Sequence, residues 1–515
     1  MRRLLVLATS VLAAALLAPP VAAAAPGVAI THRTVPGADG VPLDAKVIEP
    51  TGRGDGPFPL LVMPASWATP NIEYVGAAAG MAYDSGYVVV TYTARGFYAS
   101  GGAVDVGGPA DVGDASAVID WALANTGADP GRIGMGGISY GAGISVLTAA
   151  ADPRVRAVAA MSGWSDLLAS LYPNETVSTQ AAEALLAVGH VTGRFGPELR
   201  ELERAYREDR VEDVLHLGDD RSPLREVDRL NANGTAVLLA NAWEDSLFQP
   251  GQITDLYRRL TGPKHLLLSP GDHATPDLFG AAGLPNDVWD AARRWFDHHL
   301  RGADNGVDTE NPVRLAPISG GTWRDHPDWE SVTGTVDTRH LTASGLLSDR
   351  PQPAWRREVR TGVPTAADSG TIFVNGLLQQ FTGIPPLAPV GLLDRAAAGV
   401  WQTEPYPTGV TVAGAAALHA TVVPRAETTS LVGYLYDVDP AGGGKLITHK
   451  PITLRRSTIG EPRAVDLTLE PALWHVPAGH RLALVVDTVD PRYATEPPGP
   501  PTTLTTPATL DVPLA

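Results

Sequence analysis

The chain has 515 residues, of which 39 are Lys or Arg and 56 are Asp or Glu, so its formal net charge is −17. This acidic balance disfavours nucleic acid and anionic membrane surfaces as partners, because both are bound through dense Lys and Arg. The absence of Cys excludes disulfides, thiolate metal sites and a cysteine nucleophile. Hydrophobic residues make up 44% and charged residues 18%, as in ordinary globular proteins, and the length predicts two or three domains.

The N-terminus has the pattern of an export signal. Two arginines, a mostly apolar run over residues 4–18 and a small-residue stretch at 22–25 follow one another. A positive start, an apolar middle and an A-x-A-like end are typical of a secretory signal peptide. Two prolines break the apolar run, which is too short for a membrane-spanning helix. We therefore predict a signal peptide over 1–25, cleaved near Ala25, and a secreted mature protein without a membrane anchor.

Residues 26–305 alternate short β-rich runs with helical patterns. Buried strands are predicted at Pro59–Pro64, Tyr87–Thr93, Arg132–Gly136, Val155–Met161, Thr235–Asn241 and His265–Ser269, and helices at Asp111–Asn125, Ile144–Ala151 and 287–300. Such alternation predicts an α/β domain, in which a largely parallel sheet is covered on both faces. A charged helical stretch between about 166 and 234 has no predicted strand, and we interpret it as a short helical cap above the sheet.

After Gly306 the helical periodicity mostly vanishes. Short β runs separated by Pro and Gly turns are predicted at Thr371–Val374, His419–Val423, Leu431–Val438, Leu446–Thr448, Ala464–Leu469 and Arg481–Asp487. Many short alternating strands are typical of an antiparallel sandwich. We therefore predict a C-terminal all-β jelly-roll domain over 312–515.

A nucleophile is predicted at Ser139. The residues Gly137-Ile138-Ser139-Tyr140-Gly141 match G-x-S-x-G, with a predicted strand before them and a small-residue helix after them. A strand–turn–helix elbow of this kind exposes the Ser hydroxyl above the carboxyl end of a strand. Glycines are needed there because the tight turn leaves no room for side chains.

The hydroxyl of Ser139 needs a base and an acid, which follow it along the chain in this architecture. Glu244 and Asp245 come directly after the predicted strand Thr235–Asn241, and spacing alone leaves both open as the acid. His273 follows the next predicted strand at its carboxyl end, where active sites of open α/β sheets form. His265 begins that strand, so a structural role is predicted for it.

Acyl transfer also requires two donors for an oxyanion. The backbone N–H of Tyr140 is predicted as one donor, because it follows the nucleophile. The other is expected from the loop after the early strand, where Ser66 or Trp67 can offer a backbone N–H and Trp67 an indole N–H. The sequence has no H-E-x-x-H and its Asp and His are widely scattered, so no metal and no cofactor are predicted.

With these motifs, the chain resembles the cocaine esterase / X-prolyl dipeptidyl-peptidase family of α/β hydrolases, which includes the α-amino-acid ester hydrolases. The matching segments are ARG at 94–96, SG at 100–101, the run from Asp111 to Trp121, GMGGISYGAG around Ser139, AWEDSLF, SPGDH and RWFDHHLRGADNGV at 294–307. The resemblance implies an α/β-hydrolase fold with a C-terminal jelly roll. It also implies that the acid stands two residues after Trp243, which favours Asp245.

The chain departs from this family in two places. The family's second oxyanion donor is usually a Tyr hydroxyl after the early strand, where this chain has Ser66 and Trp67; Tyr74 stands several residues further on. The cap, at roughly 70 residues, is short beside typical members. Since the cap shapes the substrate pocket, the family's substrates carry over to this chain less directly than its fold and its catalytic residues.

The sequence thus predicts a secreted serine hydrolase whose triad is Ser139, Asp245 and His273. By resemblance, its partner is a small peptide or ester: an X-Pro dipeptide unit first, with a small-acyl ester as the alternative. A peptidase of this kind needs a carboxylate for the substrate amine, and the candidates in the cap are Asp166, Glu175 and Glu183. The oligomeric state cannot be read from the sequence.

A different class of function, a non-catalytic polymer-binding protein, is the remaining alternative. It would use exposed aromatic residues of the β domain, for which Trp355, Trp401 and Tyr406 are the candidates.

Overall fold

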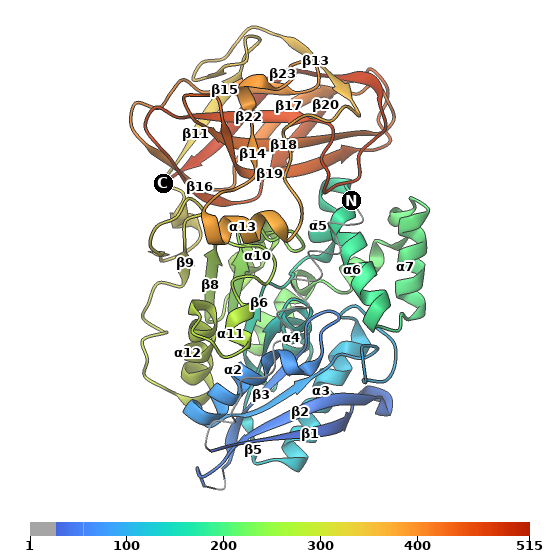
Figure 1. Ribbon diagram of the computed structural model, residues 1–515, viewed down its shortest axis with the longest axis vertical. Coiled ribbons are helices and arrows are strands. Elements are labelled where there is room, and N and C mark those ends of the chain that lie inside the picture. The colour runs from blue at the N-terminus through green and yellow to red at the C-terminus, as the bar shows by residue number, and fades with distance from the viewer. Residues whose placement is uncertain (1–26, 55) are drawn as a thin grey trace.

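The computed structural model describes residues 27–54 and 56–515, which form a mixed α/β unit and a β-rich unit stacked along the long axis (Figure 1). The predicted signal peptide over 1–25 lies outside the described residues. In the part of the chain that is described, no helix is long and apolar enough to span a bilayer.

A ten-stranded sheet forms the centre of the α/β unit. In spatial order its strands are β1 (Val28–Pro36), β2 (Pro42–Pro50), β4 (Val88–Tyr92), β3 (Phe58–Pro64), β5 (Ala128–Ile138), β6 (Val155–Met161), β7 (Ala236–Ala242), β8 (Lys264–Ser269), β9 (Val313–Leu315) and β10 (Arg324–His326). Neighbours from β4 to β9 are parallel, whereas β1, β2 and β10 pair antiparallel at the two edges. The six predicted strands are confirmed, with ends shifted by a few residues.

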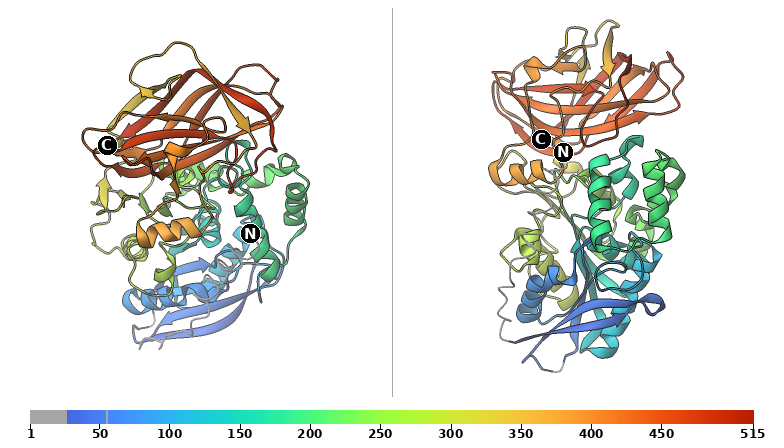
Figure 2. Two further views of the ribbon diagram at one scale, coloured as in Figure 1. Left: turned by 45° about the horizontal axis from the view of Figure 1, so that its top comes forward. Right: turned by 45° about the vertical axis from the view of Figure 1, so that its right-hand side comes forward.

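Helices cover both faces of this sheet (Figure 2). Outside the cap they are α2 (Val75–Gly80), α3 (Pro109–Asn125), α4 (Tyr140–Ala151), α10 (Pro250–Arg259), α11 (Leu278–Ala281) and α12 (Asp287–Arg301). Along β3, Leu60 and Val62 join the core shared with α3 and α4, while Leu61 and Met63 join the core shared with α2 and α12. Both faces of the strand are apolar because both are buried, as expected for a parallel sheet.

The cap lies between β6 and β7 and is mostly helical, apart from turns and two isolated β-bridges that Gly193 and Phe195 make with Phe97 and Val104. Its helices are α5 (Leu167–Leu171), α6 (Thr179–Thr192), α7 (Pro197–Arg207), α8 (His216–Asp219) and α9 (Val227–Asn233). α6 and α7 stand beside the sheet and below the β-rich unit (Figure 1). The cap also contacts that unit: Gln180 Nε2 donates to Pro491 O at 2.8 Å, and Thr179 Oγ1 donates to Arg492 O at 3.0 Å.

The β-rich unit consists of two antiparallel sheets. One sheet has eight strands: β11 (Thr335–Leu341), β12 (Leu347–Ser348), β13 (Arg356–Thr361), β16 (Val410–Gly414), β17 (Ala417–Val423), β20 (Arg463–Thr468), β21 (Ala472–Val476) and β23 (Gly499–Leu514). The other has five: β14 (Leu387–Ala388), β15 (Gly399–Gln402), β18 (Thr429–Val438), β19 (Gly444–Leu454) and β22 (Arg481–Asp487). Leu435 of one sheet and Leu467 of the other share one apolar core. This arrangement confirms the predicted α/β-hydrolase fold with a C-terminal all-β domain.

The first sheet continues past residue 305: β9 pairs with β8 and β10 pairs with β9, and Val313 and Leu315 are fully buried. One predicted strand is wrong. The predicted strand Thr371–Val374 instead leads into helix α13 (Val374–Thr382). Phe373 has φ 63°, which breaks the extended backbone that a strand requires.

Candidate active site

Ser139 occupies a sharp turn between β5 and α4. Its backbone has φ 56° and ψ −116°, a strained conformation for a residue with a side chain. The turn passes so close to β3 that a Cβ on Gly141 would lie 2.0 Å from Pro64 O. The predicted elbow is therefore present, and glycine is required at position 141 for steric reasons.

His273 and Asp245 reach Ser139 from the loops that follow β8 and β7. His273 Nε2 lies 2.8 Å from Ser139 Oγ, and His273 Nδ1 lies 3.0 Å and 3.1 Å from the two carboxylate oxygens of Asp245. All three side chains are buried. The structure thus brings together three residues that are up to 134 positions apart in sequence, in the geometry of a Ser–His–Asp triad.

Backbone groups fix the carboxylate of Asp245 in this position. Its Oδ1 accepts hydrogen bonds from Leu247 N at 2.9 Å and Phe248 N at 2.7 Å. Glu244, the other candidate acid, makes no hydrogen bond with His273 among the described residues: its Oε2 accepts a long hydrogen bond, 3.3 Å, from Gly271 N, and its Oε1 has no partner there. Burial raises the pKa of Glu244 to about 8. Geometry therefore selects Asp245 as the partner of the imidazole.

The charges around His273 favour its protonated form. Burial by itself lowers the pKa of His273, but the adjacent carboxylate of Asp245 and the hydrogen bond to it outweigh burial, so that the pKa is raised. Asp277 lies near enough to add to this effect, although its own pKa is raised to about 7 by burial. An imidazole in this setting can accept the proton of Ser139 and stabilise the resulting positive charge.

Three residues that sequence reasoning missed hold the histidine loop. Asp272 accepts hydrogen bonds from Ser246 N at 2.8 Å and from His273 N at 2.7 Å, which ties the acid loop to the histidine loop. Ser162 Oγ donates to Asp277 at 2.7 Å and accepts from Ala274 N at 3.1 Å. Asp272 stands next to His273 in the SPGDH segment, and this position could have identified it from the sequence. No sequence pattern marks Ser162 or Asp277.

The predicted oxyanion donors have different outcomes. Tyr140 is the first residue of α4, so its backbone N–H has no partner within the helix. Ser66 is not available, because its N–H donates to Glu73 at 2.8 Å. The indole of Trp67 is not available either, since Nε1 donates to Leu185 O at 3.0 Å.

The backbone N–H of Trp67 remains the candidate for the second donor, because no hydrogen bond within residues 27–54 and 56–515 engages it. Tyr74 cannot substitute for it. Its hydroxyl accepts from Ile138 N at 2.8 Å, underneath the elbow, and its side chain is fully buried.

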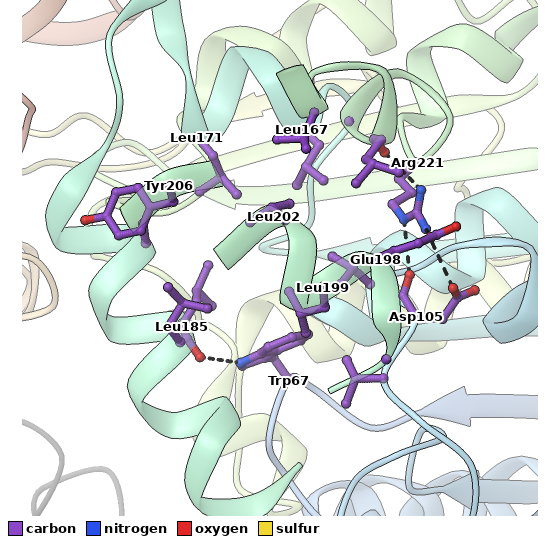
Figure 3. A pocket seen from close by; sticks show the side chains of 18 of the residues that line it. Trp67, Asp105, Leu167, Leu171, Leu185, Glu198, Leu199, Leu202, Tyr206 and Arg221 are labelled. Carbon is purple, nitrogen blue, oxygen red and sulfur yellow. Dashed lines mark hydrogen bonds and ion pairs between the residues drawn. The ribbon is translucent and has the colours of Figure 1, made fainter. Parts of the chain in front are cut away.

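A cavity of about 490 Å³ lies between Ser139 and the cap. Figure 3 shows leucines of the cap helices pointing into it, with Trp67 on one side and an ion pair between Arg221 and Glu198 on another. Ser139 and Tyr140 belong to its wall. A substrate bound there therefore lies against the nucleophile.

The three carboxylates predicted to bind a substrate amine lie outside this cavity. Asp166 caps α5 by accepting from Ala169 N at 2.9 Å, Glu183 pairs with Arg207 and the hydroxyl of Tyr206, and Glu175 is exposed. Membership of the cap made them candidates, but Asp166 and Glu183 bond to neighbouring cap residues and Glu175 faces solvent.

The aromatic residues predicted for polymer binding are core residues. Trp355 is 6% exposed and donates to Leu341 O, and Trp401 is fully buried and donates to Thr342 O. Tyr406 is half-buried and packs against the same core. The polymer-binding alternative has no support from these residues.

Two family models match this chain. Residues 39–275 match the family described as X-Pro dipeptidyl-peptidase (S15 family), and residues 305–511 match the X-Pro dipeptidyl-peptidase C-terminal non-catalytic domain. A Streptomyces avermitilis protein named as an Xaa-Pro dipeptidyl-peptidase is 26% identical over 70% of this chain and 54% of its own length, so the chain spans about half of that relative. Cocaine esterase from a Rhodococcus strain is 24% identical over 84% of both chains.

Solved structures share the fold over nearly the whole chain. An α-amino acid ester hydrolase superposes with a TM-score of 0.72 and 18% identity, covering 97% of this chain and 98% of the other. A CocE/NonD family hydrolase from Staphylococcus aureus gives a TM-score of 0.73 and 14% identity, covering 97% of this chain and 100% of the other. The arrangement of an α/β-hydrolase unit with a β domain is therefore common to these proteins.

Proposed function

We propose that this chain, which belongs to the X-Pro dipeptidyl-peptidase (S15) family of serine peptidases and esterases, cleaves an ester or amide bond through an acyl-enzyme on Ser139. The observation that carries this proposal is the hydrogen-bonded series Ser139–His273–Asp245 at the wall of a cavity. A serine hydroxyl is a weak nucleophile unless a positioned base removes its proton.

In the first half of the reaction, Ser139 Oγ attacks the substrate carbonyl carbon while His273 Nε2 takes the hydroxyl proton. Asp245 accepts the Nδ1–H of His273, which holds the imidazole in the tautomer that leaves Nε2 free to act as base. The backbone N–H groups of Tyr140 and Trp67 bind the oxygen on which negative charge develops.

In the second half, His273 gives its proton to the leaving alcohol or amine, and the acyl group stays on Ser139. Water then enters, gives a proton to His273 and attacks the acyl carbon. Return of that proton to Ser139 Oγ releases the carboxylic acid product and restores the free enzyme.

Two substrate classes remain as candidates. An X-Pro dipeptide unit is supported by both family matches and by the name of the Streptomyces relative. An ester is supported by the likeness to cocaine esterase over most of both chains and by the apolar cap cavity. A panel of Ala-Pro- and Gly-Pro-anilides against acetyl, butyryl and benzoyl esters separates the two classes.

Labelling with a fluorophosphonate probe tests the nucleophile. We expect the folded protein to be labelled, and Ser139→Ala to abolish labelling. Ser145→Ala is the matched control, because Ser145 is a buried serine one turn along α4 whose hydroxyl donates to Gly141 O. Absence of labelling in the folded wild-type protein would contradict the proposal.

Export belongs to the same proposal and is supported by the sequence pattern of residues 1–25. The expected mature chain starts near residue 26. Mass spectrometry of the protein recovered from the medium of its native host measures that start directly. A full-length chain retained in the cells would contradict export.

A further inference from the structure

The cap supplies most of the wall of the cavity next to Ser139. Leucines from three of its helices face the same space: Leu167, Leu168, Leu171, Leu185, Leu199 and Leu202. In Figure 3 the labelled leucines converge on one hollow from different helices. A cavity lined in this way binds an apolar ligand favourably, because the ligand moves its apolar surface out of water and gives up no hydrogen bonds.

The residues that line the cavity favour the acyl side of the scissile bond as its role. Its described lining includes Ser139, Tyr140 and Trp67, but not His273. The leaving group must face His273 Nε2, which protonates it, whereas the acyl group stays bonded to Ser139. A cavity that adjoins the nucleophile and the oxyanion donors without adjoining the base therefore receives the acyl group.

The charged side chains in the wall are already paired. Arg95 makes a two-pronged ion pair with Asp114, at 2.7 Å and 2.6 Å. Arg221 is buried, pairs with Glu198, and donates to the carbonyl oxygens of Asp105 and Leu217.

Asp105, the remaining charged residue of the wall, accepts from Ala110 N at 2.8 Å and lies 3.6 Å from Arg221. Glu198 and Asp105 share the one guanidinium of Arg221. A ligand carboxylate therefore finds no free counter-charge, and a ligand ammonium would have to lose its water and compete with Arg221 for these carboxylates, which is costly in an apolar site.

We propose that this cavity selects uncharged, apolar acyl groups of about eight to twelve carbons, or aryl-acyl groups of similar bulk. The volume sets the upper limit: a 150 Å³ apolar cavity holds benzene, so at roughly 25 Å³ per carbon a cavity of 490 Å³ has space for up to about 20 non-hydrogen atoms, and acyl groups of this length fit within it. This inference rests on the proposed function, because it names the substrate class of the same site.

A series of p-nitrophenyl esters from acetate to dodecanoate tests the proposal. Since each buried methylene contributes its transfer free energy, we expect kcat/KM to rise about fourfold per methylene, and so about 250-fold over the four methylenes from butyrate to octanoate. The matched charged substrate is the 2-aminooctanoate ester at a pH of about 6, where its amine is protonated. It should react at least about tenfold more slowly than the octanoate ester.

Two variants connect this preference to the cavity. Leu202→Trp and Leu171→Phe fill part of the space, so the best acyl chain should become shorter while labelling of Ser139 by a small fluorophosphonate continues. Leu392→Trp is the control, because Leu392 is 86% exposed in the β domain. Thermal unfolding shows whether each variant folds, and having two filling variants keeps the test valid if one does not.

The outcomes separate the two levels of the proposal. Failure of the probe to label Ser139 would contradict the proposed function itself. Normal labelling with flat or falling kcat/KM along the series, or with faster reaction of the aminooctanoate ester, would overturn only the acyl-group inference. Unchanged chain-length optima in both filling variants would overturn the assignment of this cavity as the acyl site.

Discussion

Replacement of Asp245 by Asn tests how the triad is held, because it removes a charge without changing the shape of the side chain. Asp245 Oδ1 accepts from Leu247 N and Phe248 N, while Oδ2 lies 3.0 Å from His273 Nδ1. In the variant, the amide oxygen must stay with the two backbone donors. The amide NH2 group then faces His273 Nδ1 and can only donate to it.

This orientation forces the proton of the neutral imidazole onto Nε2, 2.8 Å from Ser139 Oγ, so that no base faces the hydroxyl. We expect Asp245→Asn to lower kcat by about 10⁴-fold, or ~5 kcal/mol of transition-state stabilisation, as when the acid of other triads is replaced by its amide. The assay is the initial rate of ester hydrolysis, together with thermal unfolding to show that the variant is folded.

Glu244→Gln is the matched control, since Glu244 is the adjacent buried acid and makes no contact with His273. Its pKa of about 8 means that it is protonated at neutral pH, which glutamine imitates. We expect kcat/KM within about threefold of wild type. Two results would contradict the role of Asp245: a loss of activity in Glu244→Gln as large as that in Asp245→Asn, or an Asp245→Asn variant that keeps more than a tenth of the wild-type kcat.

Three further predictions concern pH and the elbow. The kcat/KM profile should rise with pH through an apparent pKa above 6.5, because His273 acts as a base only when neutral and its pKa is raised; a limb below 6.5 would contradict this. Native Glu244 keeps a proton that the unfolded chain loses above pH 4.5, so the free energy of unfolding should fall as pH rises toward 8, by at most ~1.4 kcal/mol per pH unit from this group. Urea unfolding at several pH values measures this free energy. For Glu244→Gln it should fall less steeply between pH 4.5 and 8 than for the wild-type protein, and an equally steep fall would contradict the prediction. Gly141→Ala should destabilise the fold by about 2–4 kcal/mol through its clash with Pro64 O, whereas Gly80→Ala, with open space around it, should be neutral or stabilising; equal melting temperatures would argue against a strained elbow.

Much of the fold could be predicted because its signals are local. The β runs at 155–161 and 481–487 and the helix at 287–300 each carry their own hydrophobic pattern, and the structure has them within a residue or two. β9 has only three residues, too few for a pattern, and it becomes a strand because β8 offers it a free edge. The segment after 370 contains apolar residues that suit a strand, but a positive φ at Phe373 turns it into a helix.

The sequence by itself determined the elbow at Ser139, the order in which acid and base follow it, and the loops that carry them, because each depends on residue types adjacent in the chain. Spacing left both Glu244 and Asp245 open and the family resemblance favoured Asp245, but only the tertiary structure showed which carboxylate lies against the imidazole: Asp245 is 3.0 Å from His273 Nδ1, whereas Glu244 accepts from Gly271 N. It also showed that Ser66 donates to Glu73 and is therefore no oxyanion donor. The direction of a side chain depends on backbone angles and on partners far away in sequence, and a pattern of residue types does not contain that information.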